Sequence, residues 1–373
     1  MAISQIDSSR ELLQKLVQTG WQSWTTAPTS LLRFPLYNYQ PREKQTNFPV
    51  NYFLQPPSKK PAYGWCSWYH YGLDIDETKI LDQARWISQN AKPQKLPLEY
   101  VLIDDGWTLW GDWLNEDRQK FPTGLKKTVQ KINRLGLKAG IWLAPFLVDP
   151  QSKLAKNHPD WLVTKHGRLV EGLNLTPWDR YLPHHKWLLD IQNPQVQKYL
   201  YRTLDYLIKD CAVDLIKLDF LYAPSFDPHL SGTQADTFLR NYLSRIKKNY
   251  PAVYTVACGC PLVPAVGVVD SMRISFDTLV ISPYLKFLKL PILSRWHLDK
   301  IVLPTLRRRL WTKKFWRVDP DVFMCQKSIG FTHQQLIKFQ QIIKSSQGNI
   351  FLGDDLTQLP TQLLKRYLQP LFN

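Results

Sequence analysis

The sequence lacks a long apolar run and has few cysteines for its length of 373 residues. No apolar run approaches the roughly 18 residues of a membrane-spanning helix, so we expect no membrane span. The first residues lack the apolar centre of a secretion signal, which predicts a cytoplasmic protein. The five cysteines are odd in number and scattered, as free thiols are. Cys258-Gly259-Cys260 is not a zinc-ligand spacing, and no histidines follow at a suitable distance, so we assign no metal and no cofactor.

Acidic residues are scarce relative to basic ones. Asp and Glu number 31 against 48 Lys and Arg, which gives a net charge of +17 and favours an anionic partner such as nucleic acid or an anionic surface. The excess is concentrated in residues 286–317, where ten Lys or Arg face only Asp299. A solvated helix face is the alternative interpretation. In either case we expect this basic segment to lie on the surface and not in a pocket.

Strand-like and helix-like segments alternate regularly after residue 62. Strands are expected at residues 63–68, 98–103, 138–143, 213–222, 252–257, 271–275, 318–324 and 349–353. Helices are expected at residues 76–90, 124–135, 194–209, 233–249, 296–311, 332–345 and 360–370, with Asp76 as an N-cap and a hairpin around residues 166–167. This alternation predicts an α/β fold, a (β/α)8 TIM barrel over residues 62–373. Residues 1–61 are expected to form a short arm that begins with a helix and lies over the barrel.

The stretch from Val213 to Tyr222 carries two charges in an apolar strand pattern. Because side chains alternate along a strand, Lys217 and Asp219 point to the same side. Such charges are costly to bury unless they pair or contact a ligand. The stretch alone leaves open a structural ion pair and a catalytic site at the carboxyl end of a barrel strand.

Polar residues also follow several of the other expected strands. They are Asp104, Asp105, Trp142, Arg273, Asp277, Asp319, Asp321, Asp354 and Asp355. Carboxylates accept hydrogen bonds from hydroxyl groups, and tryptophan rings cover C–H faces, so this collection suits a polyhydroxylated ligand. Two carboxylates are also the groups that cleave a glycosidic bond.

Together, these residues and the segments around them resemble the catalytic barrel of the α-galactosidases of glycoside hydrolase family 36, clan D. The two most informative segments are Ile103-Asp104-Asp105-Gly106-Trp107 and Ile216-Lys217-Leu218-Asp219-Phe220. Further matching segments lie at residues 64–71, 111–113, 121–124, 140–146, 158–161, 258–262, 264–267, 272–278 and 319–321. The resemblance extends from about Trp65 to Leu356, and it implies a retaining glycoside hydrolase that cleaves terminal α-D-galactosides or oligosaccharides by double displacement.

The resemblance also implies a role for individual residues. Asp219 corresponds to the nucleophile and Asp277 to the general acid/base. The sugar would be held by Asp104, Asp105, Lys217, Arg273, Trp68, Trp142 and Cys258, and Trp24 or Trp21 in the N-terminal arm would close the pocket. We expect Lys217 to lower the pKa of Asp219, and the apolar neighbours of Asp277 to raise its pKa.

The chain departs from the family in four places. It shows only a remnant of the β-sandwich that usually precedes the barrel, and no β-domain after it. Ser275-Phe276 stands where the family commonly has glycine-proline before the acid/base, and residues 279–316 bear little resemblance. The alternatives are therefore an α-galactosyl transglycosidase of the raffinose-synthase kind and a non-catalytic sugar- or anion-binding barrel.

Overall fold

Nine parallel strands form one sheet at the centre of the protein, and the sheet closes on itself. The computed structural model describes residues 57–172, 186–279 and 291–373. The sheet order is β11-β10-β9-β8-β3-β2-β1-β13-β12. The edge strands β11 (Arg317–Asp319) and β12 (Val322–Phe323) are successive parts of one strand, interrupted at Pro320 and Asp321. Because β11 pairs with β10 and β12 pairs with β13, this interrupted strand joins the two edges of the sheet. The result is the predicted eight-membered barrel.

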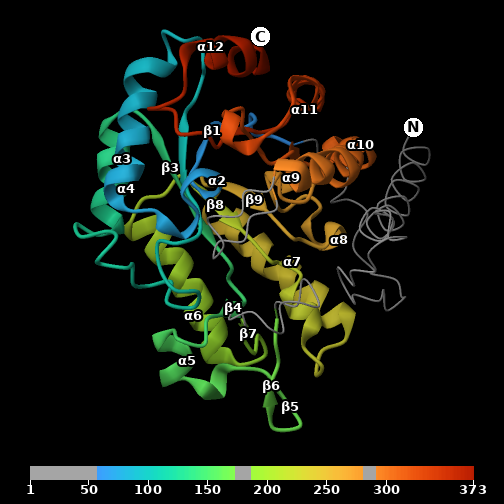
Figure 1. The fold of residues 1–373 in the computed structure, drawn as a ribbon. Helices are drawn as coiled ribbons and strands as arrows, with labels where there is room; N and C mark the ends of the chain where they lie inside the picture. The colour runs from blue at the N-terminus through green and yellow to red at the C-terminus, as the bar shows by residue number, and fades with distance from the viewer. Residues whose placement is uncertain (1–56, 173–185, 280–290) are drawn as a thin grey trace.

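Helices surround these strands, as Figure 1 shows. The other barrel strands are β1 (Tyr63–Cys66), β2 (Tyr100–Ile103), β3 (Lys138–Leu143), β8 (Leu215–Leu218), β9 (Tyr254–Ala257), β10 (Ser271–Arg273) and β13 (Ile350–Leu352). The helices of the barrel are α2 (Trp68–Tyr71), α3 (Glu77–Trp86), α4 (Leu125–Arg134), α6 (Pro194–Asp205), α7 (Gly232–Asn249), α8 (Leu262–Ala265), α9 (Pro291–His297), α10 (Leu303–Arg309), α11 (His333–Ser346) and α12 (Thr361–Leu363). The predicted alternation of strands and helices is confirmed, and the backbone N–H of Lys79 donates to Asp76, the predicted N-cap, at 2.8 Å.

The alternation of side chains along each strand divides the core into two parts. Ile216 and Leu218 of β8 belong to the large cluster packed beneath the helices. Leu215 belongs to a second cluster inside the barrel, together with Leu102 of β2 and Val256 of β9. Lys217 is two residues from Leu215, so its side chain enters the same interior. The strand period therefore directs charged residues into the carboxyl end of the barrel.

An excursion follows β3 at this end of the barrel and extends away from it in Figure 1. It contains β4 (Leu147–Val148), α5 (Lys153–Asn157), β5 (Thr164–Lys165), β6 (Arg168–Leu169) and β7 (Trp187–Leu188). Strands β5 and β6 form the predicted hairpin, in which His166 and Gly167 have φ of 51° and 73°. Two successive left-handed residues are typical of a two-residue hairpin turn.

Several predicted boundaries differ from the structure. The strand expected to reach Trp68 ends at Cys66, and Trp68 begins helix α2. The strand expected at residues 213–222 covers only Leu215–Leu218, because Phe220 adopts a left-handed φ of 52° that ends the extended backbone. The predictions for residues 1–56, including the first helix and Trp24, lie outside the described residues. Across the described ranges, no helix combines the length and apolarity that a membrane crossing requires.

Candidate active site

The inward-facing rows of side chains end in charged groups at the carboxyl end of the barrel. On β2 the inner-core residue Leu102 is followed two positions later by Asp104, and on β8 Leu215 is followed by Lys217 and Asp219. Neighbouring strands hold these rows in register, since Trp142 pairs with Lys217 and Lys217 with Val256. The barrel thus brings residues from distant parts of the sequence into one site.

Asp104 and Lys217 form an ion pair inside this site. The Nζ of Lys217 lies 2.8 Å from Oδ2 of Asp104, and the two side chains are only 9% and 3% exposed. The thiol of Cys66 donates to the same oxygen at 3.3 Å. Burial alone would lower the pKa of Lys217, but the charge of Asp104 and smaller contributions from neighbours that include Asp219 together outweigh it and hold that pKa well above its ordinary value. The ion pair of Lys217 is thus with Asp104, which follows β2, two strands away in the sheet, and the expected effect of Lys217 on Asp219 stays a prediction.

Asp219, which directly follows β8, is held by hydrogen bonds on both carboxylate oxygens. The indole Nε1 of Trp142 donates to Oδ2 at 3.0 Å, and the backbone N–H of Phe220 donates to Oδ1 at 2.7 Å. The left-handed backbone at Phe220 accompanies this second bond, and strain of this kind clusters at functional sites. Cys258 lies at the end of β9, where burial and the charge of Asp219 raise the pKa of its thiol well above the ordinary value. Asp219 is therefore fixed in orientation.

Asp105 and two aromatic rings form another part of the site. The indole Nε1 of Trp110 donates to Asp105 Oδ1 at 2.9 Å, and the Trp110 ring lies 5.1 Å from that of Trp142. Lys186 lies over the Trp110 ring, 5.0 Å from its centroid. Burial, with the nearby charge of Asp104 adding to it, raises the pKa of Asp105 to about 7. Sequence reasoning missed Trp110, although its position five residues after Asp105 was a usable signal.

Asp277 lies beyond the end of β10 and is anchored by Arg273. The guanidinium Nη2 of Arg273 lies 2.9 Å from Oδ1 of Asp277, and the Arg273 side chain is 4% exposed. Desolvation raises the pKa of Asp277 while Arg273 opposes the rise, and the charge of Asp219 adds to it. The Asp277 side chain is 59% exposed, so water screens these effects. The predicted rise in the pKa of Asp277 is confirmed. Neighbouring charges affect this pKa in addition to the burial.

A second carboxylate, Asp321, contacts the same Arg273 nitrogen as Asp277 does. Its Oδ2 lies 2.7 Å from Nη2 of Arg273 and accepts from Thr278 N at 2.6 Å and Thr278 Oγ1 at 2.8 Å. The hydroxyl of Tyr69 also donates to this oxygen. Asp321 adopts φ of 79° in the interruption between β11 and β12. Sequence reasoning grouped it with the strand-end carboxylates but assigned it no role, and Pro320 inside an expected strand was the signal of the interruption.

Other predicted residues lie in different surroundings. Trp68 is half-buried against the inner core, and Asp319 is buried and accepts from the backbone N–H of Asp321 at 3.0 Å. Asp354 accepts from the backbone N–H groups of Cys325 and Gln326 at 2.9 Å each, and so closes a loop. Not every strand-end carboxylate therefore belongs to the site.

The basic segment agrees only in part with its expected surface position. Arg307, Lys313 and Lys314 are exposed, whereas Arg309 is 1% exposed. The described part of the segment also contacts the site, since Nε2 of His297 lies 2.7 Å from the backbone oxygen of Asp277. Residues 280–290, which include the start of this segment, lie outside the described residues.

The chain is similar to known α-galactosidases in sequence and in structure. It is 29% identical over 212 residues to α-galactosidase 1 of Pediococcus pentosaceus, covering 52% of this chain and 26% of that protein. It is 30% identical over 162 residues to α-galactosidase AgaA of Geobacillus stearothermophilus, covering 41% of this chain and 20% of that protein. The chain thus spans about a quarter or less of the length of these curated relatives.

Solved structures show the same similarity over more of the chain. The α-galactosidase TtGalA of Thermus thermophilus, in complex with p-nitrophenyl α-D-galactopyranoside, superposes with a TM-score of 0.68 at 25% identity. That superposition covers 86% of this chain and 63% of TtGalA. The crystal structure of the family 36 α-galactosidase AgaA from G. stearothermophilus gives a TM-score of 0.59 at 19% identity, which shows the shared fold. The Melibiase family model matches residues 64–259, from β1 to the strand end that carries Cys258. This match covers more than half of the chain, which therefore belongs to the Melibiase family.

Proposed function

We propose that this protein hydrolyses terminal α-D-galactosides with net retention of anomeric configuration. The observation that carries the proposal is the placement of two carboxylates at the barrel mouth, with Asp219 after β8 and Asp277 after β10. Only β9 lies between these strands, so both carboxylates can face one anomeric carbon. Retaining enzymes hold such a pair about 5–5.5 Å apart, which leaves no room for a water between them.

The surroundings of the two carboxylates support different roles. Asp219 is oriented through both oxygens by Trp142 and Phe220, as suits a nucleophile that must attack from one direction. Asp277 is exposed and has a raised pKa, which favours the protonated form that a general acid needs. It would protonate the leaving oxygen while Asp219 bonds to the sugar carbon. The same group, now deprotonated, would then remove a proton from the water that releases the sugar.

The substrate proposal concerns galactose and depends on Asp104, Asp105 and Lys217. These polar groups are buried and held in fixed positions, so a sugar with an inverted hydroxyl leaves at least one of them without a partner. An unpaired buried polar group costs about 1–3 kcal/mol. We therefore expect a p-nitrophenyl α-galactoside to be hydrolysed at least tenfold faster than the corresponding α-glucoside. Equal turnover of the two would contradict the substrate proposal.

Azide rescue tests the two catalytic roles separately. With Asp219→Gly, azide enters from the vacated face and should yield the β-galactosyl azide. With Asp277→Gly, an activated substrate still forms the covalent intermediate, and azide should capture it as the α-galactosyl azide. Exchanged products would reverse the roles, and inversion by the unmodified protein would exclude double displacement.

The exposed part of the basic segment is proposed to hold an anionic partner. Arg307, Lys313 and Lys314 are exposed on α10 and the helical turn after it. The net charge of +17 supports electrostatic attraction of a polyanion. Such binding should weaken as salt concentration rises.

A further inference from the structure

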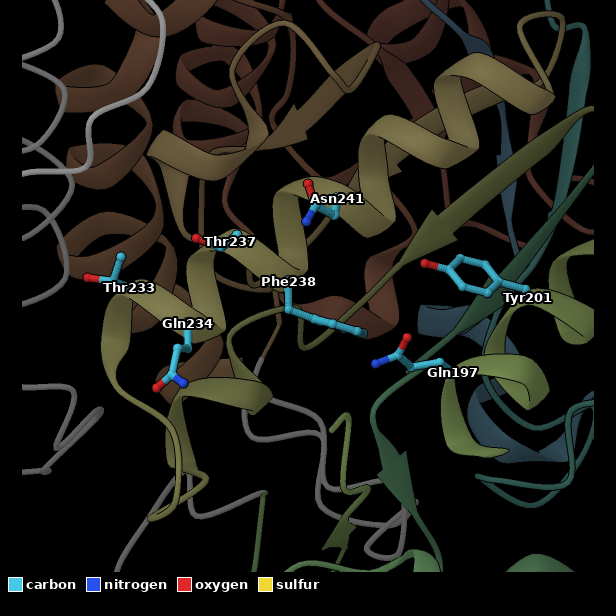
Figure 2. Close-up of a pocket in the computed structure, with 7 residues that line it drawn as sticks. All are labelled: Gln197, Tyr201, Thr233, Gln234, Thr237, Phe238 and Asn241. Atoms are coloured by element: carbon cyan, nitrogen blue, oxygen red, sulfur yellow. The ribbon is translucent and has the colours of Figure 1, made fainter. Parts of the chain in front are cut away.

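A groove lies between the outer helices α6 and α7, outside the barrel interior. It has a volume of about 440 Å³ and is lined by Gln197, Tyr201, Thr233, Gln234, Thr237, Phe238 and Asn241. Residues spaced by four share one face of a helix, and this spacing sets Gln197 and Tyr201 on α6 opposite Thr233, Thr237 and Asn241 on α7. Figure 2 shows the two α6 side chains pointing toward α7, and Phe238 pointing back toward them. The volume is within the range of small-ligand sites.

The lining of the groove contains no charged residue, in a chain whose net charge is +17. It consists of three side-chain amides, three hydroxyl groups and one phenyl ring. Amides and hydroxyls both donate and accept hydrogen bonds, as sugar hydroxyls do. The phenyl and phenol rings offer apolar surface for the C–H faces of a sugar. This lining favours a neutral polyhydroxylated ligand over an ion.

The two aromatic rings of the groove pack against other side chains of the protein. The Phe238 ring is stacked with Tyr242 at 6.3 Å and meets Phe146 edge-on at 5.8 Å. The Arg245 guanidinium covers one face of the Tyr201 ring at 3.7 Å from its centroid. The rings are therefore preorganised, which reduces the entropy lost on binding.

The amides are also partly committed, which determines what each can offer a ligand. The Nε2 of Gln197 donates to the backbone oxygen of Ile191 at 2.8 Å, so its amide oxygen remains as an acceptor. The Oε1 of Gln234 accepts from the backbone and hydroxyl of Ser231 at 2.8 Å each, so its NH2 group remains as a donor. Within residues 57–172, 186–279 and 291–373, the side-chain amide of Asn241 has no hydrogen-bond partner.

We infer that this groove binds a neutral oligosaccharide chain at a site separate from the catalytic pocket. Both helices begin at the end of the barrel where the candidate active site lies, and five of the seven lining residues come from their N-terminal halves. A polysaccharide held there would stay close to the barrel mouth. The inference goes beyond the proposed function, because binding in the groove requires neither Asp219 nor Asp277.

Affinity electrophoresis of the full chain through a gel that contains neutral galactomannan tests the inference. We expect retardation of the unmodified protein and at least fivefold weaker apparent affinity after Asn241→Arg, which fills the groove. The matched control is Gln195→Arg, which adds the same side chain at an exposed position on α6 outside the groove. Turnover of a small aryl α-galactoside should stay within twofold in both variants.

Two further measurements keep the inference open to refutation. The double variant Thr237→Ala with Asn241→Ala removes polar groups without adding bulk or charge, and it should also weaken retardation. Undiminished retardation of the Asn241→Arg variant would overturn the inference, as would retardation abolished by Asp104→Asn, which would place the polymer in the catalytic pocket. Groove-dependent retardation in a protein that fails to hydrolyse galactosides would support the inference and refute the proposed function.

Discussion

Removing the charge of Asp321 tests whether this carboxylate positions and tunes the acid/base Asp277. The Asp321 side chain is 1% exposed and lies 2.7 Å from Nη2 of Arg273, which also contacts Asp277 at 2.9 Å. Asp321→Asn keeps the shape of the side chain and removes its charge. Of the two carboxylates that contact Arg273, Asp277 is then the one that remains. Loss of one partner from a buried ion pair costs about 3–5 kcal/mol. Because Arg273 retains Asp277, we expect roughly 2–3 kcal/mol lower free energy of unfolding, measured by urea denaturation.

The same variant should change the pH dependence of catalysis in a defined direction. With Asp321 neutral, the Arg273 charge acts undivided on Asp277 and favours its ionised form, so the pKa of Asp277 falls. A general acid must be protonated to act, so the alkaline limb of kcat/KM should move to lower pH. The assay is kcat/KM of an aryl α-galactoside from about pH 4 to pH 9.

Tyr69→Phe is the matched control for this prediction. It removes the hydrogen bond that the Tyr69 hydroxyl donates to Asp321 and leaves both carboxylates charged. We expect it to lower stability by about 1 kcal/mol and to leave the alkaline limb in place. An unmoved limb in Asp321→Asn, or an equal shift in both variants, would refute the reasoning, because the effect would not follow the charge.

The remaining predictions concern backbone conformation, a buried carboxyl group and the basic surface. Gly259→Ala should lower the free energy of unfolding, measured in urea, by about 1–2 kcal/mol. The reason is that φ is +53° at Gly259 and that a Cβ would lie 3.2 Å from a neighbouring ring carbon. An unchanged stability would show that the backbone relaxes. Asp105, whose pKa burial raises to about 7, binds a proton more readily in the folded than in the unfolded state, so its contribution to stability is complete below its ordinary pKa and is lost as pH rises through about 7. Asp105→Asn should therefore flatten the decline of stability between about pH 4 and pH 7, and an unchanged slope would contradict this assignment. Arg307→Gln with Lys313→Gln should weaken heparin binding and reduce its salt dependence while aryl galactoside turnover persists. The control Lys126→Gln on α4 should change neither heparin binding nor its salt dependence. A large loss of turnover in the double variant would place the basic segment in the active site.

The barrel was predictable because its signals are local. The alternation around Ile216 and Leu218 indicated a strand, and it also placed Lys217 on the inward side, where the structure has it. Boundaries were less predictable: the β8 strand stops before Phe220 because of a left-handed residue, and the sequence carries no glycine there to signal it. Periodicity identifies the elements, whereas their ends depend on contacts made by the folded chain.

The contacts of the site were less predictable than its members. Asp104 and Lys217 are 113 residues apart in sequence, and only closure of the barrel brings them together. Asp219 was the nearer candidate for Lys217 in sequence, but side chains two positions apart on one strand stand side by side rather than facing each other. Trp110 was missed for a related reason, since its bond to Asp105 arises from the loop between them rather than from a strand period.

The interruption of the seventh barrel strand links the closure of the fold to the placement of the acid/base. Before the interruption, β11 pairs with β10, which carries Arg273; after it, β12 pairs with β13 and completes the barrel. Asp321 stands between the two parts, and its left-handed backbone accompanies a carboxylate that contacts Arg273 and Thr278. A continuous strand would direct alternate side chains to opposite faces and could not place that carboxylate in the same way. Backbone strain of about 1–3 kcal/mol at such a residue persists only when surrounding contacts outweigh it, and here those contacts are the ones that hold Asp277. Relieving the strain with Asp321→Gly would therefore remove the support of Asp277 along with it, so stability and placement of the acid/base depend on the same residue.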